Sequence, residues 1–170
     1  MDEPTAWLYQ AAADREAAEH LVARSTGAGR CYAVAHWQQT VEKSIKAMVL
    51  ALHEAGVLGS GIRPWHEVEP YVAWLLRLPR AAPNRAIQGV LRGLLSQGAR
   101  AGIRALDALV PRWPPPRNTE YPFRDAGGDW TYPAAAGVFS QAESDQFRAL
   151  AYRVLGAAGR VVSLIRRRPG

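Results

Sequence analysis

Apolar residues recur at helical spacing along most of the chain and predict a succession of helices. The clearest stripe lies in the segment 31–55, where large apolar residues recur every three or four positions: Val34, Trp37, Val41, Ile45, Met48 and Leu52. The segment 4–25 carries a weaker stripe that predicts the opening helix. The last helix is expected to begin after Ser140, which forms a capping box with Glu143, and to reach about residue 166.

Glycine and proline separate these helices and leave room for shorter ones between them. Residues 25–29 are expected to form the first loop, and a shorter helix is expected to open at Trp65 after a second glycine-rich loop. Two further helical candidates lie at about 84–96 and 99–110. The prolines at 114–116 then predict an extended linker, because proline removes a backbone donor and fixes the backbone dihedral.

No segment alternates β-branched and polar residues over five or more positions, so no sheet is expected. The residues between Pro122 and Ser140, which include several glycines, are expected to be irregular. The sequence therefore predicts an all-α protein, an antiparallel up-and-down helical bundle of four to five main helices with an inserted helical segment. A length of 170 residues favours one domain over 1–170.

The composition excludes several classes of protein. Cys31 is the single cysteine, which rules out an intrachain disulfide scaffold and favours a reducing compartment. No two histidines share the four-residue spacing of a helical zinc motif, so neither a metal nor a cofactor is expected. No apolar run approaches the roughly 18 residues of a membrane span, and the first residues lack the order of a signal peptide. We therefore expect a cytoplasmic protein without a membrane partner.

The net charge of +6 is unevenly distributed along the chain. Residues 1–76 carry six Lys or Arg against nine Asp or Glu, a balance of −3, and residues 77–170 carry fifteen Arg against six acids, a balance of +9. Guanidinium groups bind phosphate through paired donors, so this half suggests a phosphate-bearing partner. Arginine-rich coding together with a solvated basic tail at 166–170 would produce the same excess, and both interpretations stay open.

Four polar residues lie three or four positions apart beside the apolar stripe of 31–55: Gln39, Glu42, Lys43 and Lys46. Two half-buried lysines beside a carboxylate are suited to bind an anion such as a nucleotide phosphate. The same spacing fits an ordinary ion pair between Glu42 and Lys46, worth about 0.3–0.5 kcal/mol at a helix surface. Spacing alone favours the ordinary ion pair.

Three more candidate residues lie outside that helix. His66 follows a glycine-rich loop near a helix start, where it either contacts a ligand or packs as a capping residue. Arg117 and Tyr121 accompany Pro122 in a turn before the last helix. Arg117 could form a fork to Glu42 inside the bundle or to a phosphate at its surface, and the sequence does not choose between these partners.

The run from His36 to Ala47 resembles the signature helix of the HEPN domain. It places an aromatic residue before Gln-Gln, then two spacers, Glu-Lys, two spacers and Lys-Ala. Further features follow in the order of that family, namely the opening helix from Trp7 to Leu21, His66 after a loop, and the Tyr121–Pro122 turn. The resemblance covers residues 4–78 and 117–166, so that residues 80–115 are expected to be an insertion.

The resemblance implies an antiparallel helical bundle that forms a homodimer and associates with nucleotides or RNA. It also implies a partner protein of the nucleotidyltransferase type, in a pair that acts as a toxin and antitoxin. The nucleotide- or phosphate-binding candidates are then Lys43, Lys46, His66, Arg117 and Tyr121, with Gln39 and Glu42 in support.

Some members of this family are metal-independent ribonucleases, which use an arginine followed after four to six residues by a histidine near the C-terminal helices. No histidine follows His66 in this chain, so that pair is not transferred, although Arg15/His20 and Arg30/His36 show the spacing in the first two helices. The leading hypothesis is a non-catalytic or weakly catalytic bundle that associates with nucleotides or RNA and with a partner protein. The alternatives are a ribonuclease toxin and a non-catalytic dimerisation or interaction module.

Overall fold

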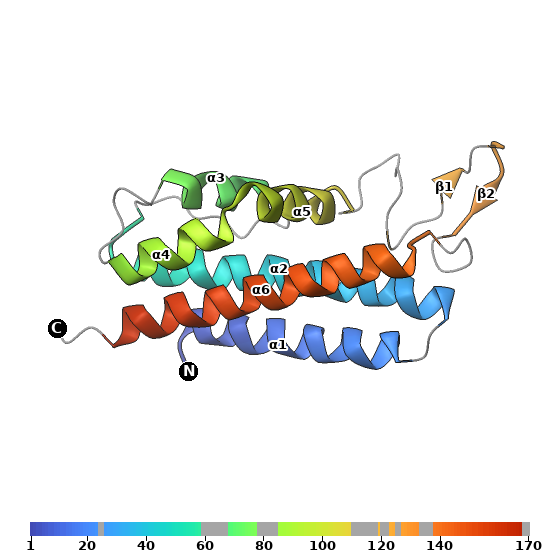
Figure 1. Ribbon diagram of the computed structural model, residues 1–170. Helices are drawn as coiled ribbons and strands as arrows, with labels where there is room; N and C mark the ends of the chain where they lie inside the picture. Colours follow the sequence, from blue (N-terminus) through green and yellow to red (C-terminus); the bar gives the residue numbers. More distant parts are fainter. Residues whose placement is uncertain are drawn as a thin grey trace.

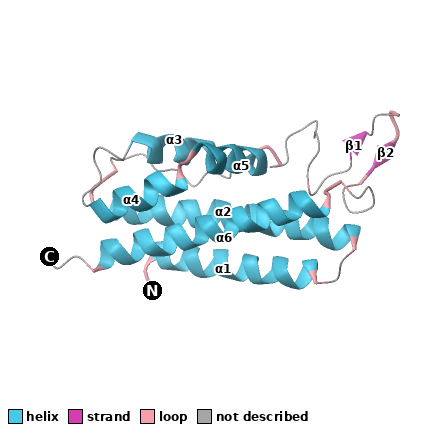
Figure 2. Ribbon diagram, viewed as in Figure 1, coloured by secondary structure: helices cyan, strands magenta, loops and turns pink. Residues whose placement is uncertain are grey.

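The computed structural model describes residues 1–23, 26–58, 68–77, 85–109, 119, 123–124, 127–132 and 138–167. Within them the chain forms helices and a short hairpin (Figures 1 and 2). The helices are α1 (Glu3–Val22), α2 (Gly27–Glu54), α3 (Glu69–Arg77), α4 (Arg85–Leu94), α5 (Gln97–Asp107) and α6 (Gln141–Arg166). The hairpin pairs β1 (Phe123–Arg124) with β2 (Trp130–Thr131). The prediction of an all-α helical bundle is confirmed.

The long helices α1, α2 and α6 form the main body, and α3, α4 and α5 lie on the side away from α1 (Figure 1). Helix α1 runs antiparallel to the other two, whereas α2 and α6 run in the same direction. Arg30 near the start of α2 donates to the Phe139 carbonyl just before α6, over 3.3 Å. At the opposite end of the body, Arg166 of α6 bonds to Asp2 before α1. The intervening segment therefore returns the chain to the end at which α2 begins.

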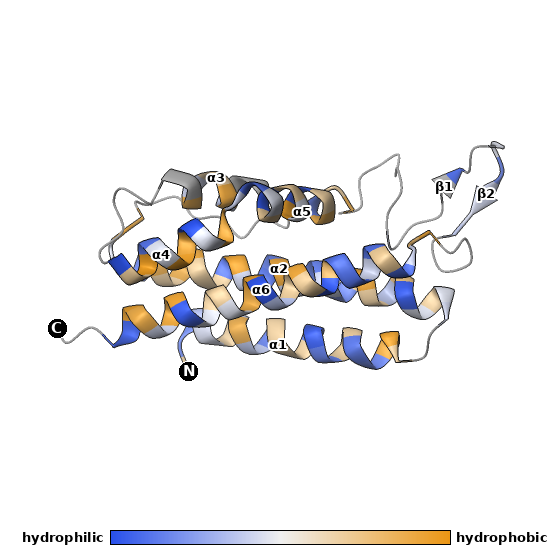
Figure 3. Cartoon of the chain, in the orientation of Figure 1, coloured by the Kyte–Doolittle hydropathy of each residue, from blue (hydrophilic) through white to orange (hydrophobic). Residues whose placement is uncertain are grey.

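The core is built around α2. All six residues of its predicted apolar stripe are buried, with exposures of 1% or less. Burying a side chain of this size contributes about 1.5–3 kcal/mol. Helices α1, α3, α5 and α6 all contact α2, so this helix is covered on most of its circumference. Figure 3 shows apolar residues, in orange, alternating with hydrophilic ones, in blue, along α6. The described part of the chain holds no helix long and apolar enough to cross a membrane.

Helix α2 begins four residues earlier than the sequence pattern suggested. Residues 25–29 were expected to form a loop, but Thr26 caps the helix by accepting a hydrogen bond from the Gly29 amide at 2.9 Å. Gly29 lies so close to α1 that a Cβ there would come within 2.7 Å of the Leu21 carbonyl oxygen. The glycine that resembles a helix breaker in sequence therefore allows the first two helices to approach each other closely.

The expectation of an irregular chain between Pro122 and Ser140 is wrong for part of that segment. Phe123 pairs with Thr131 and Arg124 with Trp130 in an antiparallel hairpin. Gly128 has a φ of +89° in the connecting turn, a backbone conformation that favours glycine. The Arg124 guanidinium donates to the Gly128 carbonyl at 2.8 Å and lies over the Trp130 ring, which explains how so short a strand pair is held.

The shorter helices and the last helix agree with their predicted positions to within a few residues. Helix α4 falls inside the predicted 84–96, and α5 starts two residues before the predicted 99–110. The capping box at the start of α6 is confirmed: Ser140 Oγ accepts from the Glu143 amide at 3.2 Å, and the Ser140 amide donates back to Glu143 at 2.9 Å.

Several predicted features lie outside the described residues. They are the glycine-rich loop at 59–64, the helix opening at 65–67, the linker at 113–116, the turn at 121–122 and the end of the basic tail at 168–170. These stay predictions.

Gly29→Ala tests the close approach of α1 and α2. The added methyl would clash with the Leu21 carbonyl, so the free energy of unfolding should fall by about 1–3 kcal/mol. Gly156→Ala is the matched control, because a Cβ at that exposed position of α6 meets no atom within 4 Å. Higher helix propensity should stabilise the control by about 0.5–1 kcal/mol. Urea unfolding curves measure both changes, and a gain in both variants would contradict the close approach.

Candidate functional site

The predicted phosphate-binding lysines lie in a polar cluster between α1 and α2. Asp14 of α1 is 7% exposed and accepts a hydrogen bond from Lys43 Nζ at 2.5 Å. The same carboxylate lies 3.4 Å from Nδ1 of His36. The two contacts come from residues two turns apart on α2, so one carboxylate of α1 contacts two successive turns of the longer helix.

The second lysine is buried beside its own helix's carboxylate. Lys46 Nζ lies 2.5 Å from Glu42, and the two side chains are 6% and 5% exposed. The ammonium group also lies 5.0 Å from the centre of the Trp7 ring of α1, a cation–π contact. The ordinary ion pair between Glu42 and Lys46 that spacing favoured is therefore present, although it is buried rather than exposed.

Both lysines thus face protein carboxylates in the structure. Breaking a buried pair leaves an uncompensated charge. The pair of Asp14 with Lys43 therefore holds α1 against α2, whereas Glu42 and Lys46 pair within α2. Gln39 is half-buried on the same edge of α2. His66, Arg117 and Tyr121 lie outside the described residues, so their convergence on this edge stays a prediction.

Cys31, the single cysteine, lies near the start of α2 beside Thr119. Its Sγ is 3.7 Å from the Thr119 carbonyl oxygen, and the side chain is 1% exposed. Burial raises the pKa of the Cys31 thiol to about 11. The thiol is therefore protonated near neutral pH, which makes it unsuited to act as a nucleophile. This contact places Thr119 beside Cys31, and Cys31 lies about 18 Å from Lys43 along the axis of α2.

The two Arg–His pairs with ribonuclease-like spacing are separated by their contacts. Arg30 donates to the Phe139 carbonyl, whereas His36 lies against Asp14. Arg15 lies with its Cζ 5.5 Å from the centre of the Tyr152 ring of α6, and His20 is exposed. Arg30 and His36 therefore contact different groups, and no contact among the described residues joins Arg15 to His20.

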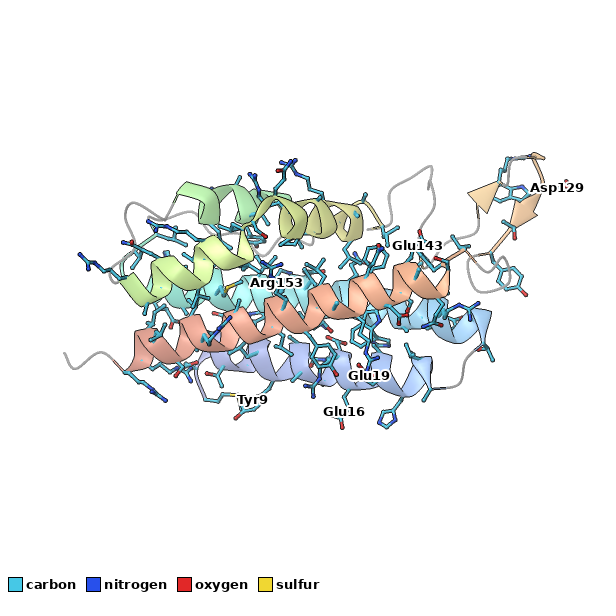
Figure 4. The ribbon with its side chains drawn as sticks, viewed as in Figure 1. Tyr9, Glu16, Glu19, Asp129, Glu143 and Arg153 are labelled. Carbon is cyan, nitrogen blue, oxygen red and sulfur yellow. The ribbon has the colours of Figure 1, made fainter. Side chains whose placement is uncertain are left out.

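Glu19 of α1 instead anchors α6. It accepts hydrogen bonds from Arg148 at 2.7 Å and from the Tyr152 hydroxyl at 2.9 Å (Figure 4). The bond to Glu19 raises the pKa of Arg148. The Tyr152 ring also lies 6.2 Å from the ring of Trp37 in the core, so this contact joins α1, α2 and α6.

A more open basic site lies between α4 and α6. A cavity of about 480 Å³ is lined by three arginines, Arg85 of α4 and Arg153 and Arg160 of α6. The rest of its lining consists of small or apolar residues: Ala86, Gly89, Val90, Gly93, Leu94 and Ala157. We call this cavity the arginine groove. None of its described lining residues is acidic.

The cations of the arginine groove are not neutralised in the described part of the chain. Arg85 and Arg160 are exposed and make no ion pair there. Arg153 donates through Nη2 to the Gly93 carbonyl and, at 3.0 Å, to Ser96 Oγ. It lies on the side of α6 that faces α4 and α5 (Figure 4). Its Nη1 and Nε hydrogens remain for a ligand.

A second cavity, of about 620 Å³, lies between α5 and α6. Its α5 side consists of Gly98, Ala99, Ala101, Gly102, Ala105 and Leu109. Its α6 side consists of Glu143, Gln146, Phe147, Ala149, Leu150 and Arg153. We call this cavity the apolar groove. Both cavities fall in the size range of small-molecule sites in proteins.

Sequence reasoning found the basic half of the chain but not these grooves. The available signal was the spacing of Arg153 and Arg160, seven residues apart on one helical face, opposite Gly89 and Gly93, four residues apart on another. Nothing in either segment says that α4 packs against α6. That pairing of helices is a property of the tertiary structure.

Comparisons with known proteins give no relative to compare with these sites. No family model, no curated protein and no solved structure matches the chain. Among the described residues, no three His, Cys, Asp or Glu side chains gather where they could hold a metal ion.

Lys43→Met tests the polar cluster of α1 and α2. The variant leaves Asp14 buried without its lysine, so the free energy of unfolding at pH 7 should fall by about 3 kcal/mol. Asp14→Leu combined with Lys43→Met removes both charges and should recover most of the stability. Urea unfolding at pH 7 measures these differences, and a loss below 1 kcal/mol would contradict the role assigned to Lys43.

Proposed function

We propose that this protein is a HEPN-type helical bundle that associates with RNA or nucleotides through their phosphate groups. The observation that carries the proposal is the arginine groove, a cavity whose three charged lining residues are all cationic. The HEPN-like run at 36–47 supports the same class of function. The lysines of that run are occupied by carboxylates, so we place phosphate binding in the arginine groove instead.

The groove offers phosphate the donors it requires. Guanidinium groups present planar, paired donors that match phosphate oxygens, and they keep their charge at any physiological pH. Helix α4 contains no acidic residue, and α6 contains none after Asp145, so the part of α6 that lines the arginine groove has no acid. Arg85 stands at the N-terminus of α4, where the helix dipole adds partial positive charge. Charge, donors and dipole therefore favour an anion at the same place.

Action together with a partner protein is the second part of the proposal, with a nucleotidyltransferase-type partner and a homodimer as the resemblance implies. The hairpin supports it. Trp130 of β2 and Tyr132, the residue that follows this strand, are 60% and 59% exposed. The Arg124 guanidinium lies over the Trp130 ring. Exposed aromatic and arginine side chains are the residues most enriched at protein interfaces.

Salt-dependent binding of a 12-nucleotide single-stranded RNA tests the phosphate site. The logarithm of the affinity should fall linearly with the logarithm of salt concentration, by about 0.7 per phosphate contacted. The double variant Arg85→Gln/Arg160→Gln should bind more weakly with a shallower slope. Fluorescence anisotropy between 50 and 200 mM salt measures the affinity. Over this interval, proteins that contact many phosphates lose about 10³–10⁵-fold in affinity.

Arg92→Gln is the charge-matched control for each of the single substitutions Arg85→Gln and Arg160→Gln. Arg92 is exposed on α4 but does not line the arginine groove. This substitution also removes one positive charge, and it should leave the salt slope nearly unchanged. Equal effects from all three positions would show that binding follows net charge alone, and no binding at 50 mM salt would refute the proposal.

Light scattering tests the homodimer. The chain has a mass of 18.6 kDa, so a dimer should give about twice this value. Trp130→Ser combined with Tyr132→Ser removes both exposed aromatic side chains and should shift the measured mass towards that of one chain. Tyr9→Ser is the control, because Tyr9 is 65% exposed but belongs to α1. A monomeric wild-type protein, or a dimer that survives the double substitution, would contradict this use of the hairpin.

A further inference from the structure

The arginine groove and the apolar groove follow each other along α6, and we call the two together the trough. Arg153 lines both cavities. On α6 the lining residues continue without a break at helical spacing: Glu143, Gln146, Phe147, Leu150, Arg153, Ala157 and Arg160. A single face of α6 therefore forms one wall of the trough. The opposite wall is α5 over the first half and α4 over the second.

Arg153 stands at the junction of the two halves. Its hydrogen bonds go to the Gly93 carbonyl at the end of α4 and to Ser96 Oγ just before α5. These bonds hold the bend between α4 and α5 against α6. The guanidinium group therefore has a fixed place where the apolar half meets the basic half.

The two halves differ sharply in chemistry. Beyond Arg153 towards the end of α6, the trough carries Arg160 and Arg85 and no described acid. Before Arg153, the walls are aliphatic and aromatic, with Gly98 and Gly102 on α5 facing Phe147 and Leu150 on α6. A Cβ added at Gly98 would meet no atom within 4 Å, whereas one added at Gly102 would come within 3.0 Å of a Leu150 methyl, so the open space lies at the Gly98 end of this wall.

The far end of the apolar half is polar again. Gln146 is exposed there and offers an amide that can both donate and accept. Glu143 lies one turn away and carries a negative charge, which repels an anion from that end. A ligand with one anionic group is therefore oriented with the anion towards Arg153 and Arg160.

We infer that the trough binds one unpaired nucleotide, with its phosphate between Arg153 and Arg160 and its base in the apolar groove. This inference rests on the proposed function and names the ligand for it. Phe147 and Arg153 are about 9 Å apart along the axis of α6, and a similar distance separates Arg153 from Arg160. The base can stack on the Phe147 side of the trough, and the exocyclic groups reach Gln146.

An unpaired base is required by this arrangement. A base inside a duplex is covered on both faces by its neighbours, so it cannot enter a groove between two helices without leaving the stack. The site therefore favours a free nucleotide or a single strand over duplex RNA. Inorganic phosphate or ribose 5-phosphate would use only the basic half.

Calorimetric titration of the full chain with three small ligands tests the inference. AMP carries both groups, ribose 5-phosphate lacks the base and adenosine lacks the phosphate. AMP should bind about tenfold more tightly than either of the others, since one stacked base or one phosphate contact is worth that much. A 12-nucleotide single strand should likewise bind more tightly than the duplex of the same sequence.

Two substitutions separate the halves of the trough. Gly98→Leu fills the apolar groove and should weaken AMP about tenfold while leaving ribose 5-phosphate unchanged. Gly156→Leu is its matched control, an exposed helical glycine with the same open surroundings that lines neither cavity. Arg160→Gln should weaken AMP and ribose 5-phosphate alike. Circular dichroism verifies that each variant keeps its helices.

The outcomes distinguish this inference from the function on which it rests. Ribose 5-phosphate binding as tightly as AMP, or AMP binding unaffected by Gly98→Leu, would overturn the base site while leaving phosphate binding intact. RNA binding without measurable AMP binding would also overturn it. Failure of both RNA and AMP to bind at low salt would refute the proposed function as well.

Discussion

The burial of α2 is the constraint on which the rest of the structure depends. This helix is covered by α1 on one side, by α6 on another and by α3 and α5 on a third. Most of the residues of this helix are buried, and each buried charge among them must find a protein partner. Asp14 on α1 for Lys43, and Glu42 for Lys46, meet that requirement. The contacts that place α1 on α2 are therefore electrostatic as well as apolar.

The same constraint divides the cations of the chain into two groups. Lys43 and Lys46 form ion pairs with Asp14 and Glu42 in the body of the bundle. Arg85 of α4 and Arg153 and Arg160 of α6 lie on the outer side of the fold, where α6 is covered by two short helices rather than a long one. Small residues on α4 and α5 keep those helices from filling the space beside α6. An open trough with unpaired cations results, and it is the part of the described structure best suited to receive an anionic ligand.

Much of the fold could be predicted from sequence, because its signals are local. The apolar stripe of α2 and the Ser140–Glu143 capping box depend on residues within a few turns of one another. The errors also have local causes. Gly27 and Gly29 suggested a loop because glycine weakens helices in general, whereas here Thr26 supplies a cap and Gly29 a close contact with Leu21. The hairpin was missed because two-residue strands leave no alternating pattern to detect.

The sequence by itself determined that the chain is helical, that α2 is its core helix, and that its C-terminal half is basic. Only the tertiary structure decided which charges are free. Lys43 looked available in a linear pattern, but Asp14 lies 29 positions earlier and reaches it across two helices. Arg153 looked like one arginine among many, yet it joins α4 and α5 to α6 and connects two cavities. A side chain's partners come from packing between helices, and helical periodicity carries no information about which helix lies opposite.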